Sequence, residues 1–241
     1  MNRQFGEFVT IFLNIGGVNL ETASGHRGEQ DEQVNLDGLT VTYIFTKRCF
    51  DFTASLLGLI LLSGVFLVIA ILIKVDDPHG KVFYSQTRLG KAGRTFQMWK
   101  FRSMVVGADK LVDKLLKKND VEGAMFKIKN DPRITRVGRV LRKYSLDELP
   151  QLYNVLRGDM SLVGPRPPLP REVVKYTSYD RQRLSVVPGV TGLWQISGRN
   201  DLGFAEMVAL DIHYINNASF FEDLKILLKT VIVVVHPTGA Y

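Results

Sequence analysis

The stretch "FTASLLGLILLSGVFLVIAILI", residues 52–73, determines how the chain is placed in its surroundings. It contains 22 residues without a charge and lies between Asp51 and Lys74. About 20 apolar residues are enough for a helix to cross the hydrocarbon core of a bilayer. Core helices of soluble proteins, the alternative, are usually shorter or carry a polar face. We therefore predict a membrane-embedded helix, which lies too deep in the chain to be a signal peptide.

The charge of the chain is uneven. The 241 residues carry a net charge of +7, yet residues 1–46 carry −4, which leaves +11 for the remainder. Such a basic surplus favours an acidic partner: phosphates, nucleic acid or an anionic membrane surface. Nucleic acid fits poorly, because the basic residues alternate with apolar ones and the sequence contains no nucleic-acid-binding motif. Cys49 is the single cysteine, which excludes an internal disulfide, and the four histidines are too far apart to bind a metal together.

Three regions follow along the chain. Residues 1–44 form an acidic tail, which we expect to be flexible. Residues 45–75 form the membrane helix, and residues 76–241 form a small domain.

The periodicity of the remaining segments predicts the fold class. Residues 74–104 alternate between apolar and polar side chains around three glycines, which indicates short strands or a hairpin. Residues 106–123 show helical periodicity, and residues 204–235 predict two helices. The expected fold is α+β and mostly helical, with amphipathic helices at the membrane interface.

The segment "DPRITRVGRVLRKYSLDEL", residues 131–149, is basic and periodic. Its arginines are Arg133, Arg136, Arg139 and Arg142, and between them lie Ile134, Val137, Val140 and Leu141. On a helix this pattern gives a basic side and an apolar side, typical of a solvated helix or of one lying on anionic lipid headgroups. Alternatively, one or two arginines bind a substrate phosphate, since a guanidinium can bond two oxygens at once. We expect both interpretations to hold in part.

Two carboxylates stand side by side in "SLDELPQLYNVLRGDMSLVGPRP", residues 145–167. Ser145 and Glu148 match a capping box, and Asp147 is then a first-turn acid favoured by the helix dipole. Pro150 also suits the start of a helix. On composition alone this structural interpretation is favoured. An ionised carboxylate there can also be a nucleophile or a metal ligand, and adjacent helical residues diverge by about 100°, so one could attack while the other binds Mg²⁺.

The blocks around these carboxylates resemble a known family. They are "YSQTRLGKAGRTFQMWKFRSM", "RVGRVLRKYSLDELPQLYNVLRGDMSLVGPRPP", "VVPGVTGLWQISGRN" and the terminal "GAY". In this order they closely resemble the bacterial sugar transferases, the monotopic phosphoglycosyl transferases that load a sugar phosphate onto polyprenyl phosphate. The resemblance covers about residues 45–241, and residues 1–44 match nothing that bears on function.

The resemblance implies a two-step exchange. The family's nucleophilic Asp falls on Asp147, which would attack the β-phosphate of a UDP-sugar, expel UMP and hold the sugar phosphate as an acyl phosphate. Undecaprenyl phosphate would then accept the sugar phosphate, which initiates the synthesis of an exopolysaccharide or another surface glycan. The family's Glu falls on Glu148, which would bind Mg²⁺, the expected cofactor. Physical chemistry agrees, because a carboxylate cannot approach a diphosphate whose charge is not neutralised.

Five basic residues are candidates for binding the substrate's phosphates: Arg166, Lys100, Arg102, Arg142 and Arg199. The family's Pro-Arg-Pro motif falls on residues 165–167, where two prolines restrict the backbone and present Arg166 with little entropy to lose; a polyproline linker is the alternative. An alternating strand would place Lys100 and Arg102 on one side, either at the phosphates or on a solvated face. Arg199 follows Trp194, which could stack on a base, pack in the core or anchor at the membrane interface.

The path of the membrane helix departs from the family. Related enzymes usually carry Ser-Pro midway, and the proline turns the helix back to the cytoplasmic side. Here the matching pair is Ser63-Gly64, which permits a bend without imposing it, and a straight helix of 22 residues would rise ~33 Å, enough to span. We predict the re-entrant form, because Ser63 can bond a freed carbonyl and Lys47-Arg48 favours keeping that end inside. The catalytic domain would then face the cytoplasm from the bacterial inner (cytoplasmic) membrane.

The expected partners are a UDP-hexose, undecaprenyl phosphate and membrane lipids. A homodimer is left open, and nucleic acid is not expected. The terminal "GAY" resembles hexose-1-phosphate transferases, so the expected donor is UDP-galactose or UDP-glucose. The alternative class is a non-catalytic basic scaffold tethered to the membrane, which would release no UMP from any sugar nucleotide.

Overall fold

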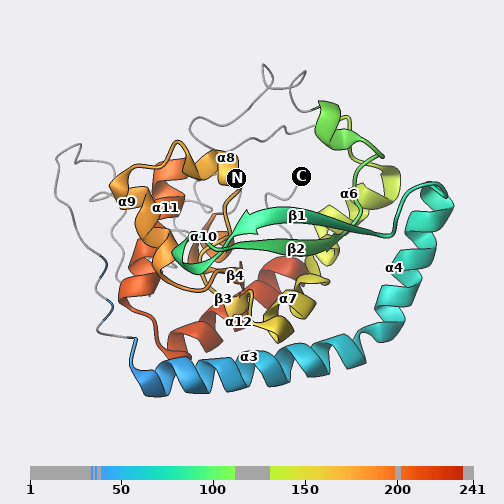
Figure 1. The fold of residues 1–241 in the computed structure, drawn as a ribbon. Coiled ribbons are helices and arrows are strands. Elements are labelled where there is room, and N and C mark those ends of the chain that lie inside the picture. Colours follow the sequence, from blue (N-terminus) through green and yellow to red (C-terminus); the bar gives the residue numbers. More distant parts are fainter. Residues whose placement is uncertain (1–33, 35, 37–38, 112–130, 199–201, 236–241) are drawn as a thin grey trace, which may run out of the picture. The chain divides into compact units, whose positions relative to one another are not determined.

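Helices and two small sheets make up the described part of the chain (Figure 1). The structure, a computed structural model, describes residues 34, 36, 39–111, 131–198 and 202–235. The elements in chain order are α3 (Val41–Leu61), α4 (Ser63–Asp76), β1 (Phe83–Leu89), η1 (Lys91–Gly93), β2 (Thr95–Phe101), η2 (Ala108–Leu111), α6 (Arg136–Lys143), η4 (Leu146–Glu148), α7 (Gln151–Arg157), β3 (Ser161–Val163), α8 (Pro170–Val173), α9 (Ser178–Arg181), η5 (Gln182–Ser185), β4 (Gly189–Thr191), α10 (Leu193–Ser197), α11 (Phe204–Asn216) and α12 (Phe220–Val235). The prediction of a mostly helical α+β fold is confirmed.

Two predicted segments lie wholly or partly outside the described residues. Most of the acidic tail over 1–44 is one of them. Of the helix predicted over 106–123, the described residues include η2, which is a 3₁₀ turn, and the rest of that prediction lies outside them.

Helices α3 and α4 form a bent pair over the long apolar stretch (Figure 1). They meet at Leu62, whose backbone (φ −89°, ψ 4°) interrupts the helix, and the bend is 59°. The break falls one residue before Ser63-Gly64, where the sequence predicted it. Among the described helices, none alone is long and apolar enough to cross a membrane. The bent pair taken together meets these criteria of length and composition.

Polar side chains on one side of α3 fix it to the domain. Arg48 donates hydrogen bonds of 2.6 and 2.8 Å to the carbonyl groups of Val155 and Leu156 in α7. These carbonyls lie in the last turn of α7, where a cation is favoured by the helix dipole, and the Val155 carbonyl also accepts from the N–H of Gly158 at 3.0 Å. Asp51, which is buried, accepts a 3.1 Å bond from the backbone N–H of Leu162 in β3. The polar side of α3 is therefore turned inward.

Asp223 at the start of α12 makes the second attachment of α3. Its carboxylate is buried and accepts bonds from Tyr43 (2.9 Å) and Lys47 (2.7 Å) of α3 and from Tyr214 (2.6 Å) of α11. Three donors thus surround one carboxylate, two of them from α3. The ion pair with Lys47 also compensates for the removal of both charges from water.

Helix α4 packs its inner side into the core. Ile69 and Ile73 are each 3% exposed and share a hydrophobic cluster with Phe101 of β2 and Leu141 of α6. Asp76 at the end of α4 accepts a bond of 3.3 Å from the backbone N–H of Val137. Both ends of the bent pair are therefore attached to the same domain.

The opposite sides of these helices expose apolar side chains. At least 40% of the surface is exposed for Ile44, Phe45, Phe52, Leu57, Ile60 and Leu61 of α3, for Val65, Leu67, Val68, Ile71, Leu72 and Val75 of α4, and for Phe221, Leu228, Val231, Ile232 and Val235 of α12. Exposed apolar surface on this scale is typical of an interface with a membrane or another protein.

The hairpin predicted over 74–104 is confirmed. Strands β1 and β2 are antiparallel, with Phe83 opposite Phe101 and Leu89 opposite Thr95. The turn between them places Gly93 in the left-handed region (φ 73°), which a residue without a Cβ adopts at little cost.

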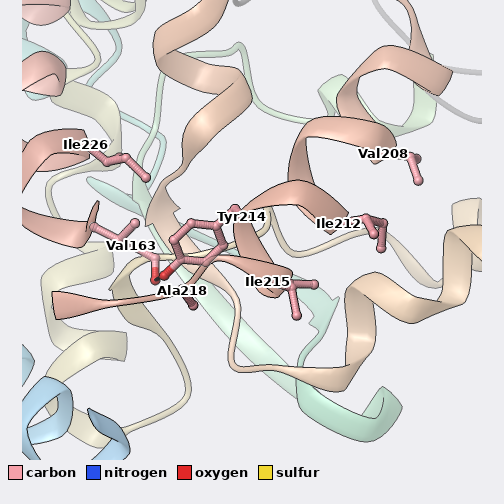
Figure 2. Close-up of a cluster of buried hydrophobic side chains, with 7 residues drawn as sticks. All are labelled: Val163, Val208, Ile212, Tyr214, Ile215, Ala218 and Ile226. Atoms are coloured by element: carbon pink, nitrogen blue, oxygen red, sulfur yellow. Dashed lines mark hydrogen bonds between the residues drawn. The ribbon is translucent and has the colours of Figure 1, made fainter. Parts of the chain in front are cut away.

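The C-terminal half is built on two helices and a short parallel sheet. Strands β3 and β4 pair in parallel, and the two helices predicted over 204–235 are α11 and α12. Figure 2 shows the core cluster that joins them, in which Val208, Ile212 and Ile215 of α11 lie with Ile226 of α12 and Val163 of β3. This half supports the sheet next to which α7 lies.

The attachment of α3 through Asp223 can be tested by substitution. Asp223→Asn keeps the size of the side chain but removes the charge, which leaves the Lys47 ammonium unpaired at a mostly buried position. We expect a loss of about 3 kcal/mol in the free energy of unfolding, measured by denaturant unfolding in detergent. Glu222→Gln, in the neighbouring and more exposed pair with Lys225, is the matched control and should cost less than about 1 kcal/mol. Equal losses in the two variants would contradict the assignment.

Candidate active site

Asp147 and Glu148 lie in a 3₁₀ turn that precedes a helix. The turn η4 ends at Glu148, and α7 begins only at Gln151. Ser145 adopts a left-handed backbone (φ 53°), and its side chain makes no capping bond. The predicted capping box of Ser145 and Glu148 is therefore wrong, because an N-cap residue has an extended backbone whereas Ser145 turns the chain sharply. The two carboxylates enter different surroundings.

Glu148 forms an ion pair with Lys100 of β2. The Nζ and Oε1 atoms are 2.5 Å apart, and the two side chains are 17% (Lys100) and 27% (Glu148) exposed. Burial alone would raise the pKa of Glu148, but the charges of Lys100 and Arg166 and the hydrogen bond from Lys100 lower it to about 2. Glu148 is therefore ionised at neutral pH.

Asp147 is buried, with 5% of its surface exposed. Burial raises the pKa of Asp147, Lys100 and Arg142 oppose the rise, and the charge of Glu148 adds to it. Two adjacent carboxyl groups thus have pKa values that are pushed in opposite directions, a pattern typical of sites in which two acids have different roles.

Arg142 is held beside Asp147 by the close approach of α6 to the end of β2. A Cβ atom on Gly138 would lie 2.0 Å from the carbonyl oxygen of Ser103, so a larger residue would push the helix away. With glycine there, the N–H of Thr135 donates to the same carbonyl at 3.1 Å, and Arg142 Nε donates to Ser103 Oγ at 2.9 Å. The guanidinium of Arg142 is thereby fixed in place.

The basic and apolar sides predicted for residues 131–149 are correct only in part. Arg133 precedes α6 and is buried in an ion pair with Asp131 at 2.5 Å. Val140, predicted on the apolar side, is 56% exposed on α6, next to the exposed Arg139. A helix of only two turns buries a narrow stripe, here Gly138 and Leu141, and leaves the rest to the surface.

The Pro-Arg-Pro segment is tied to β1. Arg88, which is buried, donates bonds to the Pro167 carbonyl (3.0 Å) and to Gln86 Oε1 (2.9 Å). Burial and the neighbouring charge of Arg166 lower the pKa of Arg88 to about 10. Arg166 therefore lies close to both Arg88 and Glu148, whose pKa values it lowers.

A pocket of about 680 Å³ brings these elements together. Eight of the described residues that line it are lysines or arginines: Lys81, Arg88, Lys100, Arg102, Arg133, Arg142, Arg166 and Arg171. Asp131 is the one carboxylate among the described lining residues. Asp147 and Glu148 are not among the lining residues, but the charges of Lys100 and Arg142, which line the pocket, act on Asp147, and Lys100 is bonded to Glu148. A pocket this rich in cations favours a ligand with several negative charges.

Four of the five predicted phosphate ligands line the pocket: Lys100, Arg102, Arg142 and Arg166. Arg102 differs from the others because it follows the end of β2 and pairs with Asp77, whose backbone carbonyl also accepts from it at 2.9 Å. Arg199 lies outside the described residues. Trp194 is 5% exposed, packs with Met207 and Leu210 and does not line the pocket. Of the three roles considered for it, packing in the core is therefore the one that the structure supports.

Two residues that position the site were missed in the sequence. Arg88 lies in the same family-like block as Lys100, which was a signal that could have identified it. Asn154, in α7, accepts from the N–H of Trp99 (3.0 Å) and donates to the carbonyl of Gln97 (2.7 Å) in β2. Its partners lie 55 and 57 positions away, so no local pattern indicates it.

The residues present fit a magnesium ion that is shared with a substrate. Among the described residues there is no group of three or more His, Cys, Asp or Glu side chains that could hold a metal by themselves. Glu148, however, is ionised, partly exposed and next to the pocket. Mg²⁺ is commonly bound by one or two carboxylates together with substrate phosphates and waters, and Glu148 can supply such a carboxylate.

Comparison with known proteins identifies the family. Residues 42–237 match the family model described as bacterial sugar transferase. The chain is 45% identical over 230 residues to the galactosyl transferase CpsE of Streptococcus agalactiae, which covers 95% of this chain and 50% of that protein. It is 46% identical over 200 residues to the exopolysaccharide production protein ExoY of Sinorhizobium fredii, covering 81% of this chain and 88% of that protein.

A third relative is the undecaprenyl-phosphate galactose phosphotransferase of Salmonella typhimurium, 46% identical over 201 residues, with 82% of this chain and 42% of that protein covered. The chain thus spans about half or less of two of these relatives and most of the length of ExoY. The family model covers both carboxylates and the described basic pocket. The chain belongs to the bacterial sugar transferase family.

Proposed function

We propose that the protein is a phosphoglycosyl transferase that moves hexose 1-phosphate from a UDP-sugar to undecaprenyl phosphate and releases UMP. The observation that carries this proposal is the placement of a buried carboxylate, Asp147, and an ionised one, Glu148, beside a pocket lined by basic residues. The names of the relatives support it, since they include an undecaprenyl-phosphate galactose phosphotransferase and an exopolysaccharide production protein. The donor is UDP-galactose or UDP-glucose, and the product initiates an exopolysaccharide or another surface glycan.

The reaction consists of two successive displacements at the β-phosphorus of the donor. A carboxylate oxygen of Asp147 attacks the β-phosphorus, the bond from that phosphorus to the oxygen of UMP breaks, and UMP leaves with the electron pair. The sugar phosphate is then held on Asp147 as an acyl phosphate. A phosphate oxygen of undecaprenyl phosphate attacks the same phosphorus, and the bond to Asp147 breaks, which restores the carboxylate. Its raised pKa makes the ionised Asp147 a stronger nucleophile than an exposed aspartate.

The surrounding residues neutralise charge and hold the reactants. Mg²⁺, when bound, supplies charge neutralisation at the diphosphate, and Glu148 holds it. Arg166, Lys100 and Arg142 line the pocket, where they would neutralise the transferred phosphate. Arg88 binds the Pro167 carbonyl and so positions Arg166.

The bent helix pair supports a re-entrant membrane anchor in the bacterial inner membrane, with the catalytic domain on the cytoplasmic side. The first half of α3 is bonded to the domain through Arg48 and Asp51, and the end of α4 is bonded to it through Asp76. A straight helix would separate its two ends by the thickness of the bilayer. Attachment of both ends to one domain is therefore what a helix that enters and leaves on one side requires.

The nucleophile is tested by Asp147→Asn. The variant keeps the shape of the side chain but removes the attacking oxygen anion, so release of UMP from UDP-galactose or UDP-glucose should fall about 10³-fold or more. In the parent protein, labelled sugar phosphate should accumulate on the chain when undecaprenyl phosphate is withheld, and hydroxylamine should release it. Glu222→Gln is the control and should retain activity. A stoichiometric label that resists hydroxylamine would exclude Asp147 as its carrier, and a chain that releases no UMP from any sugar nucleotide would be the scaffold.

The two carboxylates should have opposite effects on stability in the absence of Mg²⁺. Because the pKa of Asp147 is raised, the folded chain loses stability as pH rises above about 4, through that raised pKa. Asp147→Asn should therefore increase the unfolding temperature at pH 7, with no gain below about pH 4. The pKa of Glu148 is lowered to about 2, below the ordinary value of about 4.3 for a glutamate, so its ionised form stabilises the fold above that range. Glu148→Gln should lower the unfolding temperature at pH 7, and the loss should vanish as pH falls towards 2.

Thermal unfolding in detergent with EDTA, followed by circular dichroism between pH 3 and pH 8, measures both effects. If the two variants change the unfolding temperature in the same direction at pH 7, the assignment of the two protonation states is incorrect.

The re-entrant anchor is tested with one introduced thiol. Ser24→Cys in a Cys49→Ala background places a single reactive group before the helix pair. In intact cells a membrane-impermeant thiol reagent should leave it unlabelled, and disruption of the membrane should make it reactive. Labelling in intact cells would show that the pair crosses the membrane.

A further inference from the structure

The ammonium group of Lys100 is bonded to the carboxylate that the proposed function assigns to a metal ion. Its Nζ atom is 2.5 Å from Oε1 of Glu148, the carboxylate that would hold Mg²⁺. A magnesium ion binds carboxylate oxygen at about 2.0–2.1 Å. An ammonium hydrogen-bonded to the same oxygen would repel the ion strongly in a partly buried site. The ion pair and a metal ion bound through the same oxygen, Oε1, therefore exclude each other.

We propose that Lys100 and Mg²⁺ compete for Glu148. Lys100 neutralises Glu148 while the pocket is empty, and it moves to a phosphate oxygen of the donor when Mg²⁺ binds together with the sugar nucleotide. The inference rests on the proposed function in assigning the metal to Glu148. It goes further in giving Lys100 two successive partners and in making metal binding dependent on the substrate.

The surroundings of Lys100 suit such a movement. Lysine carries its charge on a flexible four-carbon stem with three donors that can rotate, and Lys100 lines the pocket as well as bonding to Glu148. Neighbouring guanidinium groups are fixed by several bonds: Arg88 to Pro167 and Gln86, and Arg102 to two carbonyl groups and a carboxylate. Displacing Lys100 from Glu148 requires the loss of one ion pair and no rearrangement of the backbone.

A diphosphate shifts this competition towards the metal. It brings negative charges into a pocket lined by basic residues, which gives the displaced ammonium a new partner and supplies further oxygen ligands to the ion. In the free protein neither is present, so Mg²⁺ must displace Lys100 without compensation. The free protein should therefore bind divalent cations weakly, and removal of the Lys100 charge should strengthen that binding.

Binding of Mn²⁺ to the nucleotide-free protein tests the proposal, because Mn²⁺ can replace Mg²⁺ at oxygen ligands and its paramagnetic resonance signal reports the free ion directly. Lys100→Gln and Lys100→Met should each bind Mn²⁺ about tenfold more tightly than the parent protein, whereas both lose transferase activity. Arg171→Gln removes an equal charge from the pocket lining and should leave the affinity nearly unchanged. Glu148→Gln combined with Lys100→Gln should abolish the gain.

Circular dichroism and the unfolding temperature show whether each Lys100 variant is folded. One folded variant is enough for the test. The proposal is overturned if a folded Lys100 variant binds Mn²⁺ no more tightly than the parent, if Arg171→Gln produces an equal gain, or if the gain persists without Glu148. These measurements involve no turnover. A parent protein that releases no UMP would overturn the proposed function while leaving the competition for Glu148 measurable.

Discussion

The site depends on one buried amide, the side chain of Asn154. It pairs with the N–H of Trp99 and the carbonyl of Gln97 and so gives the outer edge of β2 the partners that a third strand would otherwise supply. This fixes α7 against the hairpin. The turn that carries Asp147 and Glu148 directly precedes α7, so the same contact brings Glu148 to Lys100.

The bent helix pair is also attached to α7, through Arg48 of α3. Arg48 of α3 binds the carbonyls at the end of α7, and α3 lies along the base of the domain in Figure 1. The element nearest the proposed membrane and the element next to the catalytic turn are therefore in direct contact. In the proposed function, a lipid acceptor held in the membrane would have to reach this site, and the contact between α3 and α7 would keep the site close to the membrane.

The electrostatics of the site are a compromise between folding and reaction. Concentrating basic residues around a pocket is unfavourable in the absence of an anion, and burial of Asp147 opposes its ionised form. The ion pair of Lys100 with Glu148 relieves part of this cost in the free protein. A diphosphate and a metal ion would relieve more of it, so the free site is prepared to bind them. Sites that carry such unfavourable charges commonly lower stability in exchange for function.

The sequence by itself determined the elements whose signals are local. The apolar run over 52–73 predicted the helix pair and nearly the position of its bend, alternation predicted the hairpin, and helical periodicity predicted α11 and α12. The family-like blocks indicated four basic residues that do line the pocket. The patterns of apolar and polar residues among these signals involve residues close together in the sequence, so they can be recognised without the tertiary structure.

Only the tertiary structure decided how these elements meet. The pair of Ser145 and Glu148 has the spacing of a capping box, but Ser145 adopts a left-handed backbone, and Glu148 pairs with Lys100 of β2, 48 positions away. Likewise, the close packing of α6 on Ser103 decides which side of that helix is buried. Interactions between residues so distant in the chain form only when the core has brought their elements together, and the reactive geometry of this protein consists of such interactions.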